Sequence, residues 1–215
     1  MTVRIATYER GELVARRALA SALAQTYRRL EVLVVGDHCD PATAEAVLSV
    51  RDPRVRFVNL SERGRYPDDP RLRWMVAGAA PMNAALWLAQ GKWIAPCDDD
   101  DELSPDHVEV LLDQARRRRL ELVWSKASME LEPGRWVEAG SERLRLGSIT
   151  HGSVLYSAHL RFFAHSLTSW RLGQPSDWNL WSRMRRAGVR MGFVDRLTYV
   201  HYLEATRRPL DTGAA

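Results

Sequence analysis

Four consecutive aspartates, Asp98 to Asp101, follow the apolar run WIAPC. Neighbouring carboxylates repel one another, and this repulsion raises their proton affinity unless a cation lies close by. Mg²⁺ and Mn²⁺ prefer oxygen ligands, and they often take only one or two carboxylates from a protein and complete their shell with water and substrate phosphates. The run therefore indicates a divalent metal site beside a phosphate-bearing ligand. A solvated acidic loop, or a cap for the following helix, is the alternative that these residues alone leave open.

The elements that must position these aspartates alternate between strand and helix. Apolar runs predict strands at residues 3–7, 31–35, 55–59, 93–97 and 120–124, and periodic apolar positions predict helices from residue 11, at 42–50, at 82–90 with Gly91 as the stop, and from Ser104. This alternation predicts an α/β fold with a doubly wound, mostly parallel sheet flanked by helices. Ligands bind such sheets at the carboxyl ends of strands, so the loops after Thr7, Val35 and Pro96 are expected to share one crevice.

The remaining segments predict a small antiparallel extension and one long loop. We expect a hairpin or irregular cover at 126–146 that turns at Pro133-Gly134, a strand at 149–156, a helix at 178–187 ended by Gly188, and a last strand at 193–202. Residues 60–78 form a polar connection of a length that is usually functional or mobile. No repeat or linker divides the sequence, so a single domain is expected over residues 1–215.

Composition and charge exclude several classes of protein. The net charge of +4 and pI of about 9.4 are too mild for a dedicated nucleic-acid binder, although they suit anionic small ligands. No apolar run reaches the length of a membrane span and no secretory signal opens the sequence, so we expect a cytoplasmic protein with Cys39 and Cys97 as free thiols. The basic run Arg116–Arg119 is either a solvated helix end or a peripheral contact for anionic lipid or a polyanionic acceptor.

Several pieces of the sequence, taken in their order and spacing, resemble the inverting family 2 glycosyltransferases of the GT-A fold. The pieces are ATYER after the first strand, LASALAQTYRRLEVLVVGD, the pair Met82-Asn83 with Ala84-Ala85 before GKWIAPCDDDDELSPD, and PSDWNLWSRMRRAG near the end. The resemblance covers residues 3–125 well and 149–203 more loosely. It implies transfer of a sugar from a nucleotide-diphosphate donor to an acceptor hydroxyl, with Mn²⁺ or Mg²⁺ as cofactor. It also implies a nucleotide-sugar-binding half (1–101), an acceptor and catalytic-base half (102–204) and a tail (205–215).

The resemblance assigns the base of the nucleotide to the first two strand ends. Thr7 and Tyr8 are expected to hold the base, and a tyrosine ring can stack on its face. Asp37 is expected to accept a hydrogen bond from a ring N–H of the base. This favours a UDP- or dTDP-sugar, although guanine presents a similar N–H. Gly36 stands where the family has the first of two acids.

The diphosphate, the metal and the sugar are assigned to residues further along. Asn83 keeps half of the family's Arg-Asn pair, while Met82 replaces the arginine, and Arg71 or Arg73 is expected to take its place near the diphosphate. The resemblance implies Asp98, Asp100 and His201 as metal ligands. Asp98 is also expected to touch the donor, together with Asp99. Asp101 is expected to cap the next turn or orient a neighbour.

The acceptor side is assigned to the last third of the sequence. Asp177 matches the carboxylate that acts as general base in inverting members, although Ser176 replaces a glutamate beside it. The alternative is that Asp177 only complements the dipole of its helix. Trp178 and His151 are expected on the acceptor side, and Trp181 is expected either there or in the core.

Two other functions remain open from the sequence. Nucleotidyl transfer uses a related sheet, but those enzymes usually carry a glycine-rich stretch with arginine after the first strand, and ATYERGELVARR has one glycine. A binding module with an impaired site is the second alternative, because of the departures at Gly36 and Met82. The expected partners are a nucleotide-sugar donor and an unidentified acceptor, without nucleic acid, and self-association is left open.

Overall fold

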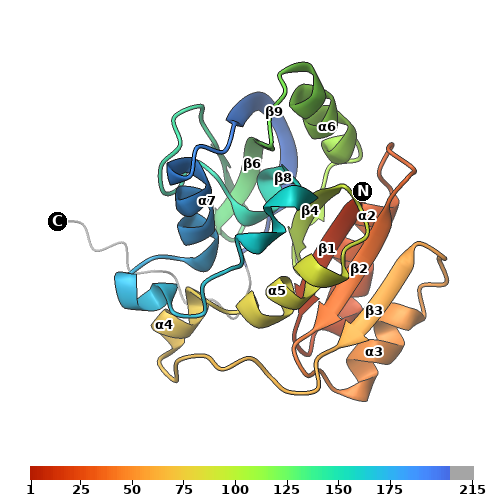
Figure 1. Ribbon diagram of the computed structural model, residues 1–215. Helices are drawn as coiled ribbons and strands as arrows, with labels where there is room; N and C mark the ends of the chain where they lie inside the picture. The colour runs from red at the N-terminus through yellow and green to blue at the C-terminus, as the bar shows by residue number, and fades with distance from the viewer. Residues whose placement is uncertain (204–215) are drawn as a thin grey trace.

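A mixed sheet forms the centre of the molecule in this computed structural model, which describes residues 1–203 (Figure 1). Its strands are β1 (Thr2–Thr7), β2 (Glu31–Gly36), β3 (Val55–Asn59), β4 (Trp93–Asp98), β5 (Glu102–Leu103), β6 (Leu122–Glu132), β7 (Arg135–Ala139), β8 (Val154–Ser157) and β9 (Met191–His201). They lie in the order β3-β2-β1-β4-β8-β6-β9-β5, and β7 pairs with β6. The expected tail, 205–215, and Glu204 lie outside the described residues.

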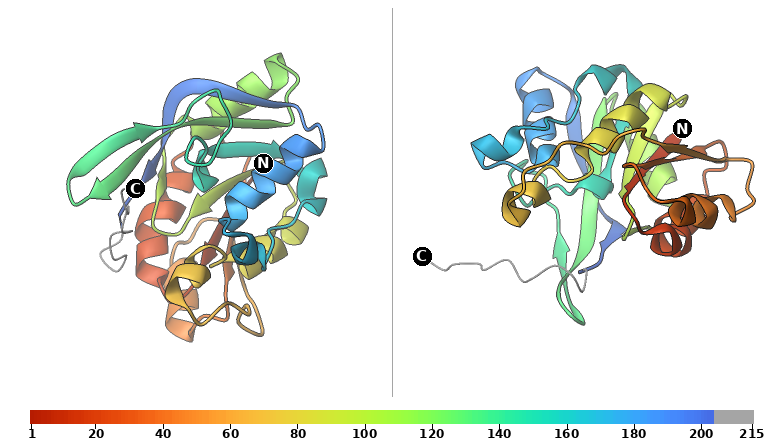
Figure 2. Two further views of the ribbon diagram at one scale, coloured as in Figure 1. Left: turned by 90° about the vertical axis from the view of Figure 1, so that its left-hand side faces the viewer. Right: turned by 90° about the horizontal axis from the view of Figure 1, so that it is seen from below.

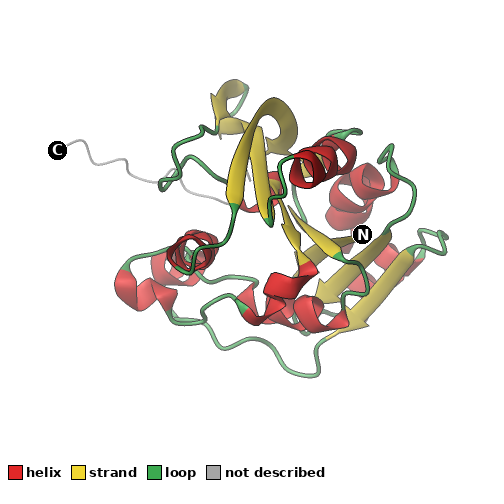
Figure 3. Cartoon of the chain, turned by 45° about the horizontal axis from the view of Figure 1, so that its top comes forward, coloured by secondary structure: helices red, strands yellow, loops and turns green. Residues whose placement is uncertain are grey.

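Helices cover both faces of this sheet (Figure 3). They are α1 (Gly11–Val14), the π-helical turn η1 (Ala15–Leu19), α2 (Ala20–Leu23), α3 (Pro41–Leu48), α4 (Pro70–Trp74), α5 (Ala79–Leu88), α6 (His107–Arg117) and α7 (Ser176–Arg186), with 3₁₀ turns η2 (His151–Ser153), η3 (Ala158–Phe162) and η4 (Ser169–Leu172). No helix among them has the length and apolar character needed to cross a membrane.

The predicted parallel half of the sheet is confirmed. β1 pairs in parallel with both β2 and β4, and β2 pairs in parallel with β3. The apolar runs are buried on both faces because their side chains alternate. Val3, Ile5 and Val34 pack in the same cluster as residues of the first helix, α3 and α6. Leu33 and Val35 face the opposite way, where α5 covers them.

The second half of the sheet supplies the antiparallel extension. β8 runs antiparallel between β4 and β6, whereas β9 runs parallel to β6 and antiparallel to β5. The hairpin of β6 and β7 turns at Pro133-Gly134, as predicted, and projects from the body of the molecule (Figure 2). Gly134 has a φ of 78°, which glycine adopts without strain.

Three expected boundaries are wrong. Residues 60–78 are not an uninterrupted loop, because α4 forms within them: the Asp69 side chain accepts hydrogen bonds from the backbone of Arg71 and Leu72, at 2.7 and 3.2 Å. The strand expected at 149–156 begins as the 3₁₀ turn η2, and only Val154–Ser157 pairs in the sheet.

The third boundary is that of α6, which begins at His107 and not at Ser104. The Ser104 hydroxyl donates to the Asp106 carboxylate at 2.9 Å, inside a turn that precedes the helix.

Gly91 has a different role from the helix stop that we expected. α5 already ends at Leu88, and the φ of Gly91 is not positive. A Cβ at Gly91 would lie 2.5 Å from the carbonyl carbon of Met1. The backbone N–H of Gly91 donates to the Thr2 hydroxyl at 2.9 Å. Glycine is required there because the chain passes directly against the start of β1.

Candidate active site

The carboxyl ends of β1, β2 and β4 open into one cleft of about 510 Å³. The expected crevice is therefore present. Its lining includes most of the residues expected to hold a donor, together with several that the sequence did not single out: Ala6, Thr7, Tyr8, Arg10, Asp37, Arg63, Tyr66, Pro70, Arg73, Trp74, Ala77, Gly78, Met82, Asp98, Asp99 and Asp100.

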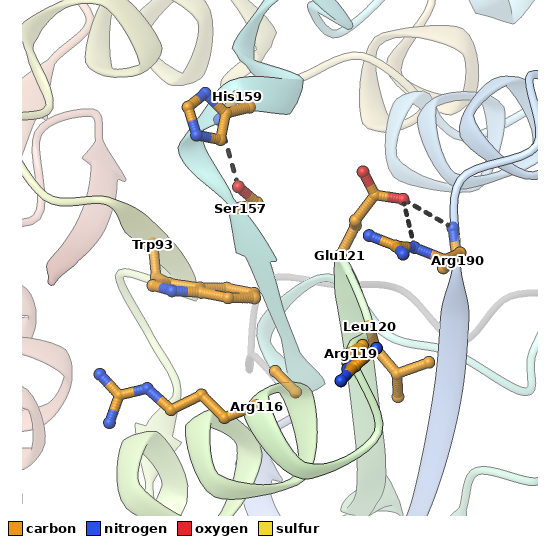
Figure 4. A pocket seen from close by; sticks show the side chains of 9 residues that line it. Trp93, Arg116, Arg119, Leu120, Glu121, Ser157, His159 and Arg190 are labelled. Atoms are coloured by element: carbon orange, nitrogen blue, oxygen red, sulfur yellow. Dashed lines mark hydrogen bonds and ion pairs between the residues drawn. The ribbon is translucent and has the colours of Figure 1, made fainter.

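A second depression, of about 310 Å³, lies at the other end of β4 (Figure 4). Trp93, Arg116, Arg119 and His159 line it with Glu121, which is paired with Arg190 at 3.3 Å. Trp93 and Asp98 are at opposite ends of a six-residue strand, roughly 17 Å apart. The candidate active site is the cleft, because the acidic run lies there.

Asp99 and Asp100 face the first helix. The Thr7 hydroxyl donates to Asp99 at 2.7 Å, and the Arg10 guanidinium lies 3.2 Å from both carboxylates. Arg17 donates to the backbone carbonyl of Asp100 at 2.7 Å. These two arginines hold the acidic run against the first helix. Their signal in the sequence is the basic pattern ERGELVARR directly after Tyr8, which by itself does not point to the aspartates.

Asp98 and Asp101 face the opposite side, toward β9 and η2. Asp98 accepts hydrogen bonds from Nδ1 of His151 at 2.8 Å and from the Tyr199 hydroxyl at 3.2 Å. Asp101 is fully buried, and it accepts from the same hydroxyl, from Nδ1 of His201 at 2.7 Å and from the backbone of Tyr202 at 2.9 Å. Tyr199 therefore links the two carboxylates.

One group of side chains can hold a metal. Ligand atoms of Asp98, Asp101 and His201 lie within 4.8 Å of one another. Two carboxylates and an imidazole suit Mn²⁺, and the carboxylates alone suit Mg²⁺. We expected Asp100 in this group, but its carboxylate points to Arg10. Asp101 also accepts from Nδ1 of His201, and a histidine held in this way binds a metal through Nε2.

The cysteine that precedes the acidic run is shielded from solvent. Cys97 is 1% exposed, and its sulfur contacts the carbonyl of Asp98 at 3.4 Å. Burial raises the pKa of the Cys97 thiol well above its usual value, and the carboxylates above it, led by Asp101, add to this rise. Cys39 is also buried, next to Asp37, and burial raises the pKa of its thiol too.

The segment after β3 occupies the end of the cleft expected to hold the base. Asp37 is 2% exposed, and its two oxygens accept from the Gly64 backbone at 2.8 Å and the Tyr66 hydroxyl at 2.7 Å. Burial, followed by the hydrogen bond to Asp37, raises the pKa of Tyr66. The guanidinium of Arg63 lies 3.7 Å above the Tyr8 ring. No pattern in the sequence distinguishes Arg63 and Tyr66 from the similar residues around them in this loop.

The glycine that replaces an expected acid has a steric cause. A Cβ at Gly36 would lie 2.6 Å from the Asn59 side-chain oxygen and 2.9 Å from the Cys39 sulfur. Asn59 in turn holds the turn after β2, since it bonds both the N–H and the carbonyl of Cys39 at 2.8 and 2.9 Å. The side chain expected at residue 36 is excluded by these neighbours.

The two arginines considered for the diphosphate lie differently from each other. Arg73 lines the cleft, and its guanidinium donates to the carbonyls of Pro67 and Asp68 at 3.0 and 2.8 Å. Arg71 is exposed on α4 and is not among the residues that line the cleft. Asn83 also lies behind the lining, where its amide bonds the N–H and the carbonyl of His165, at 2.7 and 2.9 Å.

Asp177 lies half-buried in the first turn of α7. Burial raises the pKa of its carboxyl, and the negative charge of Asp98 adds to this rise. The acid on α7 is thus close enough to the acidic run for their charges to interact. Trp178 is half-buried beside it, whereas Trp181 is fully buried and packs against Tyr156, with ring centres 5.7 Å apart. Trp181 is a core residue.

The sheet, its two helical layers and the acidic run at the end of β4 define a GT-A fold. Among solved structures, residues 1–349 of TarS from S. aureus in complex with UDP align with a TM-score of 0.71 at 16% identity, covering 94% of this chain and 60% of that one. The mannosyltransferase PcManGT from Pyrobaculum calidifontis, in complex with GDP-Man and Mn²⁺, aligns with a TM-score of 0.69 at 19% identity, covering 95% and 57%.

The sequence identifies the family. The model of glycosyl transferase family 2 matches residues 2–67 and 71–163, so the chain belongs to that family. It is 30% identical to the succinoglycan biosynthesis protein ExoO of Rhizobium meliloti (strain 1021) over 169 residues, 75% of this chain and 45% of that protein. It is 34% identical to a chondroitin synthase of Escherichia coli over 107 residues, 47% of this chain and 13% of that protein. The chain thus spans less than half the length of these relatives.

Proposed function

We propose that this protein transfers a sugar, with inversion, from a UDP- or dTDP-sugar to an acceptor hydroxyl, with Mn²⁺ or Mg²⁺ as cofactor. The observation that carries the proposal is the convergence of separate segments on one cleft. Thr7 and Tyr8, Asp37, Arg73 and the first three aspartates of the acidic run, Asp98 to Asp100, line it. The charge of Asp98 also acts on Asp177, which lies on α7. Such a cleft suits a donor that carries a base, a diphosphate and a sugar.

In this proposal the base lies between Tyr8 and Asp37. The Tyr8 ring offers a stacking face, and the Asp37 carboxylate accepts a ring N–H. Because Asp37 is buried, a base that displaces one of its present donors without donating in turn would leave part of its charge uncompensated, which disfavours cytosine donors. The protein groups that Asp37 binds now, at Gly64 and Tyr66, must yield at least one oxygen to the base.

The diphosphate lies over the acidic run. Asp98 and His201 would hold the metal, with Asp101 orienting the imidazole and Asp100 as a further candidate ligand. When bound, the metal would neutralise negative charge that develops on the leaving diphosphate. Arg73 supplies a protein cation in the same cleft, and Asp99, which also lines it, would contact the ribose or the sugar.

Asp177 acts as the general base. Its carboxylate takes the proton of the acceptor hydroxyl as that oxygen attacks the anomeric carbon, on the face opposite the diphosphate. A carboxyl whose pKa is raised by burial is a stronger base than a solvated aspartate, which suits this role. Trp178 and His151 flank this side of the site. Residues 61–78, which include α4, would cover the donor and exclude water.

The acceptor is proposed to be a carbohydrate. The named relatives are a succinoglycan biosynthesis protein, a chondroitin synthase and, at 29% identity over 167 residues, a hyaluronan synthase of Pasteurella multocida. These names support a sugar as the group that carries the acceptor hydroxyl.

A transfer assay tests the proposal. Purified protein is incubated with UDP-, dTDP- and GDP-sugars, an oligosaccharide acceptor set and either Mn²⁺ or EDTA. Metal-dependent release of UDP or dTDP is expected, and Asp100→Ala and Asp177→Asn should each reduce it at least about a hundredfold. Asp113→Asn, on the surface of α6, is the matched control. Near-wild-type transfer by both variants would overturn the assignment.

The same preparations separate the alternatives. A binding module would bind UDP in calorimetry without turnover, and its affinity would not depend on metal if the acidic run were only a loop. A nucleotidyltransferase would release pyrophosphate instead of UDP. Only a glycosyltransferase couples loss of the nucleotide sugar to a sugar-extended acceptor.

Peripheral contact with an anionic surface is a separate proposal. Arg116 and Arg119 line the depression of Figure 4 together with Arg190 and Trp93, which gives this face a positive charge and one aromatic ring. Vesicles of phosphatidylglycerol should sediment the protein at low salt, whereas phosphatidylcholine vesicles should not. An Arg116→Ser/Arg119→Ser variant should lose this binding. Equal recovery with both lipids would contradict the proposal.

A further inference from the structure

A buried arginine lies behind the acidic run, in the middle of the first strand. Arg4 is 1% exposed, and its neighbours Val3 and Ile5 point to the other face of the sheet. Within residues 1–203, no carboxylate lies within ion-pair distance of its guanidinium, and its Nε and Nη1 atoms are buried without a hydrogen-bond partner. An isolated charge of this kind is costly, and replacing buried charges by apolar residues of similar size often stabilises a protein.

The polar contacts of Arg4 are two histidines. Its Nη2 lies 3.2 Å from Nε2 of His151 and 2.9 Å from Nε2 of His165. The two rings meet edge to face, with their centres 5.7 Å apart. An arginine side chain has only donors, so both Nε2 atoms must accept. With Nε2 accepting from Arg4, each ring carries its proton on Nδ1.

The two Nδ1–H groups point to opposite sides of the site. His151 donates to Asp98 at 2.8 Å, on the metal side. His165 donates at 3.3 Å to the hydroxyl of Ser176, which is the first residue of α7. Ser176 precedes Asp177. The chain of contacts thus joins the first acid of the acidic run to the turn that carries the proposed general base.

The surroundings hold this chain in place. Asn83 on α5 fixes the backbone of His165 with two hydrogen bonds, of 2.7 and 2.9 Å. Burial, followed by the charge of Arg4, lowers the pKa of His165 well below its usual value, so this ring stays neutral beside the guanidinium. The Ser176 backbone is tied to the carbonyl of Met75 at 2.7 Å, at the end of α4.

We infer that Arg4 is a positioning residue for both carboxylates of the site. It fixes the tautomer and orientation of His151, and thereby of Asp98. Through His165 and Ser176 it also fixes the first turn of α7, and thereby Asp177. A buried residue that lowers the stability of its own strand, as Arg4 does, is expected where function constrains the sequence. This inference rests on the proposed function for the roles of Asp98 and Asp177, whereas the tautomers and the linkage do not depend on it.

Nitrogen-15 NMR of the histidine rings tests the linkage without any activity assay. In the wild-type protein, His151 and His165 should both show the Nδ1–H tautomer. In Arg4→Met, at least one of them should move toward the Nε2–H tautomer. A wild-type spectrum with either ring in the Nε2–H form, or unchanged tautomers in Arg4→Met, would overturn the inference even if the protein proves to be an active transferase.

Kinetics with folding controls tests the consequence. Arg4→Met should fold with an unchanged or higher melting temperature, lower kcat at least tenfold and raise the Mn²⁺ concentration for half-maximal rate. Arg4→Lys should recover part of the kcat. Leu33→Met, a buried change on the neighbouring strand β2, should leave kcat and the Mn²⁺ concentration for half-maximal rate within twofold of the wild-type values. A lower melting temperature with wild-type kcat in the folded fraction would mean a purely structural role and contradict the inference.

If Arg4→Met does not fold, single substitutions of the two histidines that Arg4 contacts still test the inference. His151→Phe should mainly raise the Mn²⁺ requirement, and His165→Phe should mainly lower kcat. The double variant should lose less than the product of the two single effects, since both act through one guanidinium. Fully independent effects would argue against the shared link. Absence of turnover in the wild-type protein would count against the proposed function, and the tautomers would still decide the linkage.

Discussion

The hydroxyl of Tyr66 donates a hydrogen bond to Oδ2 of Asp37 over 2.7 Å. A nucleobase that is read by Asp37 must compete with this bond. We therefore expect Tyr66→Phe to bind UDP roughly fivefold more tightly, because one neutral-to-charged hydrogen bond no longer has to be broken. Titration calorimetry measures this, with Tyr27→Phe as a control remote from the cleft. Weaker binding by Tyr66→Phe would mean that Tyr66 supports Asp37 rather than competing for it.

Gly36 should not tolerate the acid that its position suggests by family resemblance. Gly36→Asp places a side chain against Asn59 and Cys39, and we expect it to lower the free energy of unfolding by about 1–3 kcal/mol. Urea denaturation measures the change. Gly147→Asp is the comparison. That glycine has a φ of 83°, but a side chain there would meet open space, so the substitution should lower the free energy of unfolding by less than Gly36→Asp does. A stable Gly36→Asp protein would show that the turn after β2 can rearrange.

The rate of transfer should depend on the ionisation of Asp177. The base form must be deprotonated, and burial raises the pKa of this carboxyl. The acid limb of kcat/KM should therefore fall at a pH above about 3.9, the ordinary value for aspartate. Asp177→Asn should remove this limb and lower kcat by about a hundredfold to ten-thousandfold. An unchanged limb in Asp177→Asn would assign it to another group.

Stability should fall in mild acid because of a buried histidine that does not line the cleft. His107 is fully buried, its Nδ1 bonds Thr198, and burial lowers its pKa to about 4. The unfolded state, with a pKa of about 6.5, then binds a proton that the folded state does not, so stability is lost as the pH falls from about 6.5 to about 4. Between pH 7.5 and 5.5 we expect this group to contribute a loss of about 1 kcal/mol.

Urea titrations at these two pH values measure the loss, and His107→Gln should reduce it. The exposed His159→Gln is the control and should leave it unchanged. Equal pH dependence in the wild-type protein and His107→Gln would assign the loss to other groups.

The parallel half of the fold could be predicted from the sequence because its signals are local. EVLVV is apolar on both faces, and a strand of this kind has few alternatives to the middle of a parallel sheet. α4 was missed although Asp69-Pro70 is a standard helix start, because the polar composition around it suggested a loop. The segment before β8 was misread since an apolar run does not distinguish a 3₁₀ turn from a strand.

The candidate site could be predicted only where one side chain faces a ligand. Thr7, Tyr8, Asp37 and the acidic run follow strand ends, and their place in one cleft follows from topology. Arg4 could not be placed, because its partners are 147 and 161 residues away in sequence. The signal in the sequence is the charge itself, between the apolar residues Val3 and Ile5. Arg63 and Tyr66 depend on a loop conformation that composition does not determine.

The rates at which the two cysteines are alkylated can report how often the site opens. A thiol reacts with an alkylating reagent only as an accessible thiolate, and Cys97 has neither property while β4 is paired. Cys39 needs only the turn after β2 to open. Under native conditions Cys39 should therefore be alkylated much faster than Cys97, which mass spectrometry can follow over time. A donor bound at Asp37 should slow the alkylation of Cys39. The alkylation rate of Cys97 would measure how often β4 separates from its neighbouring strands.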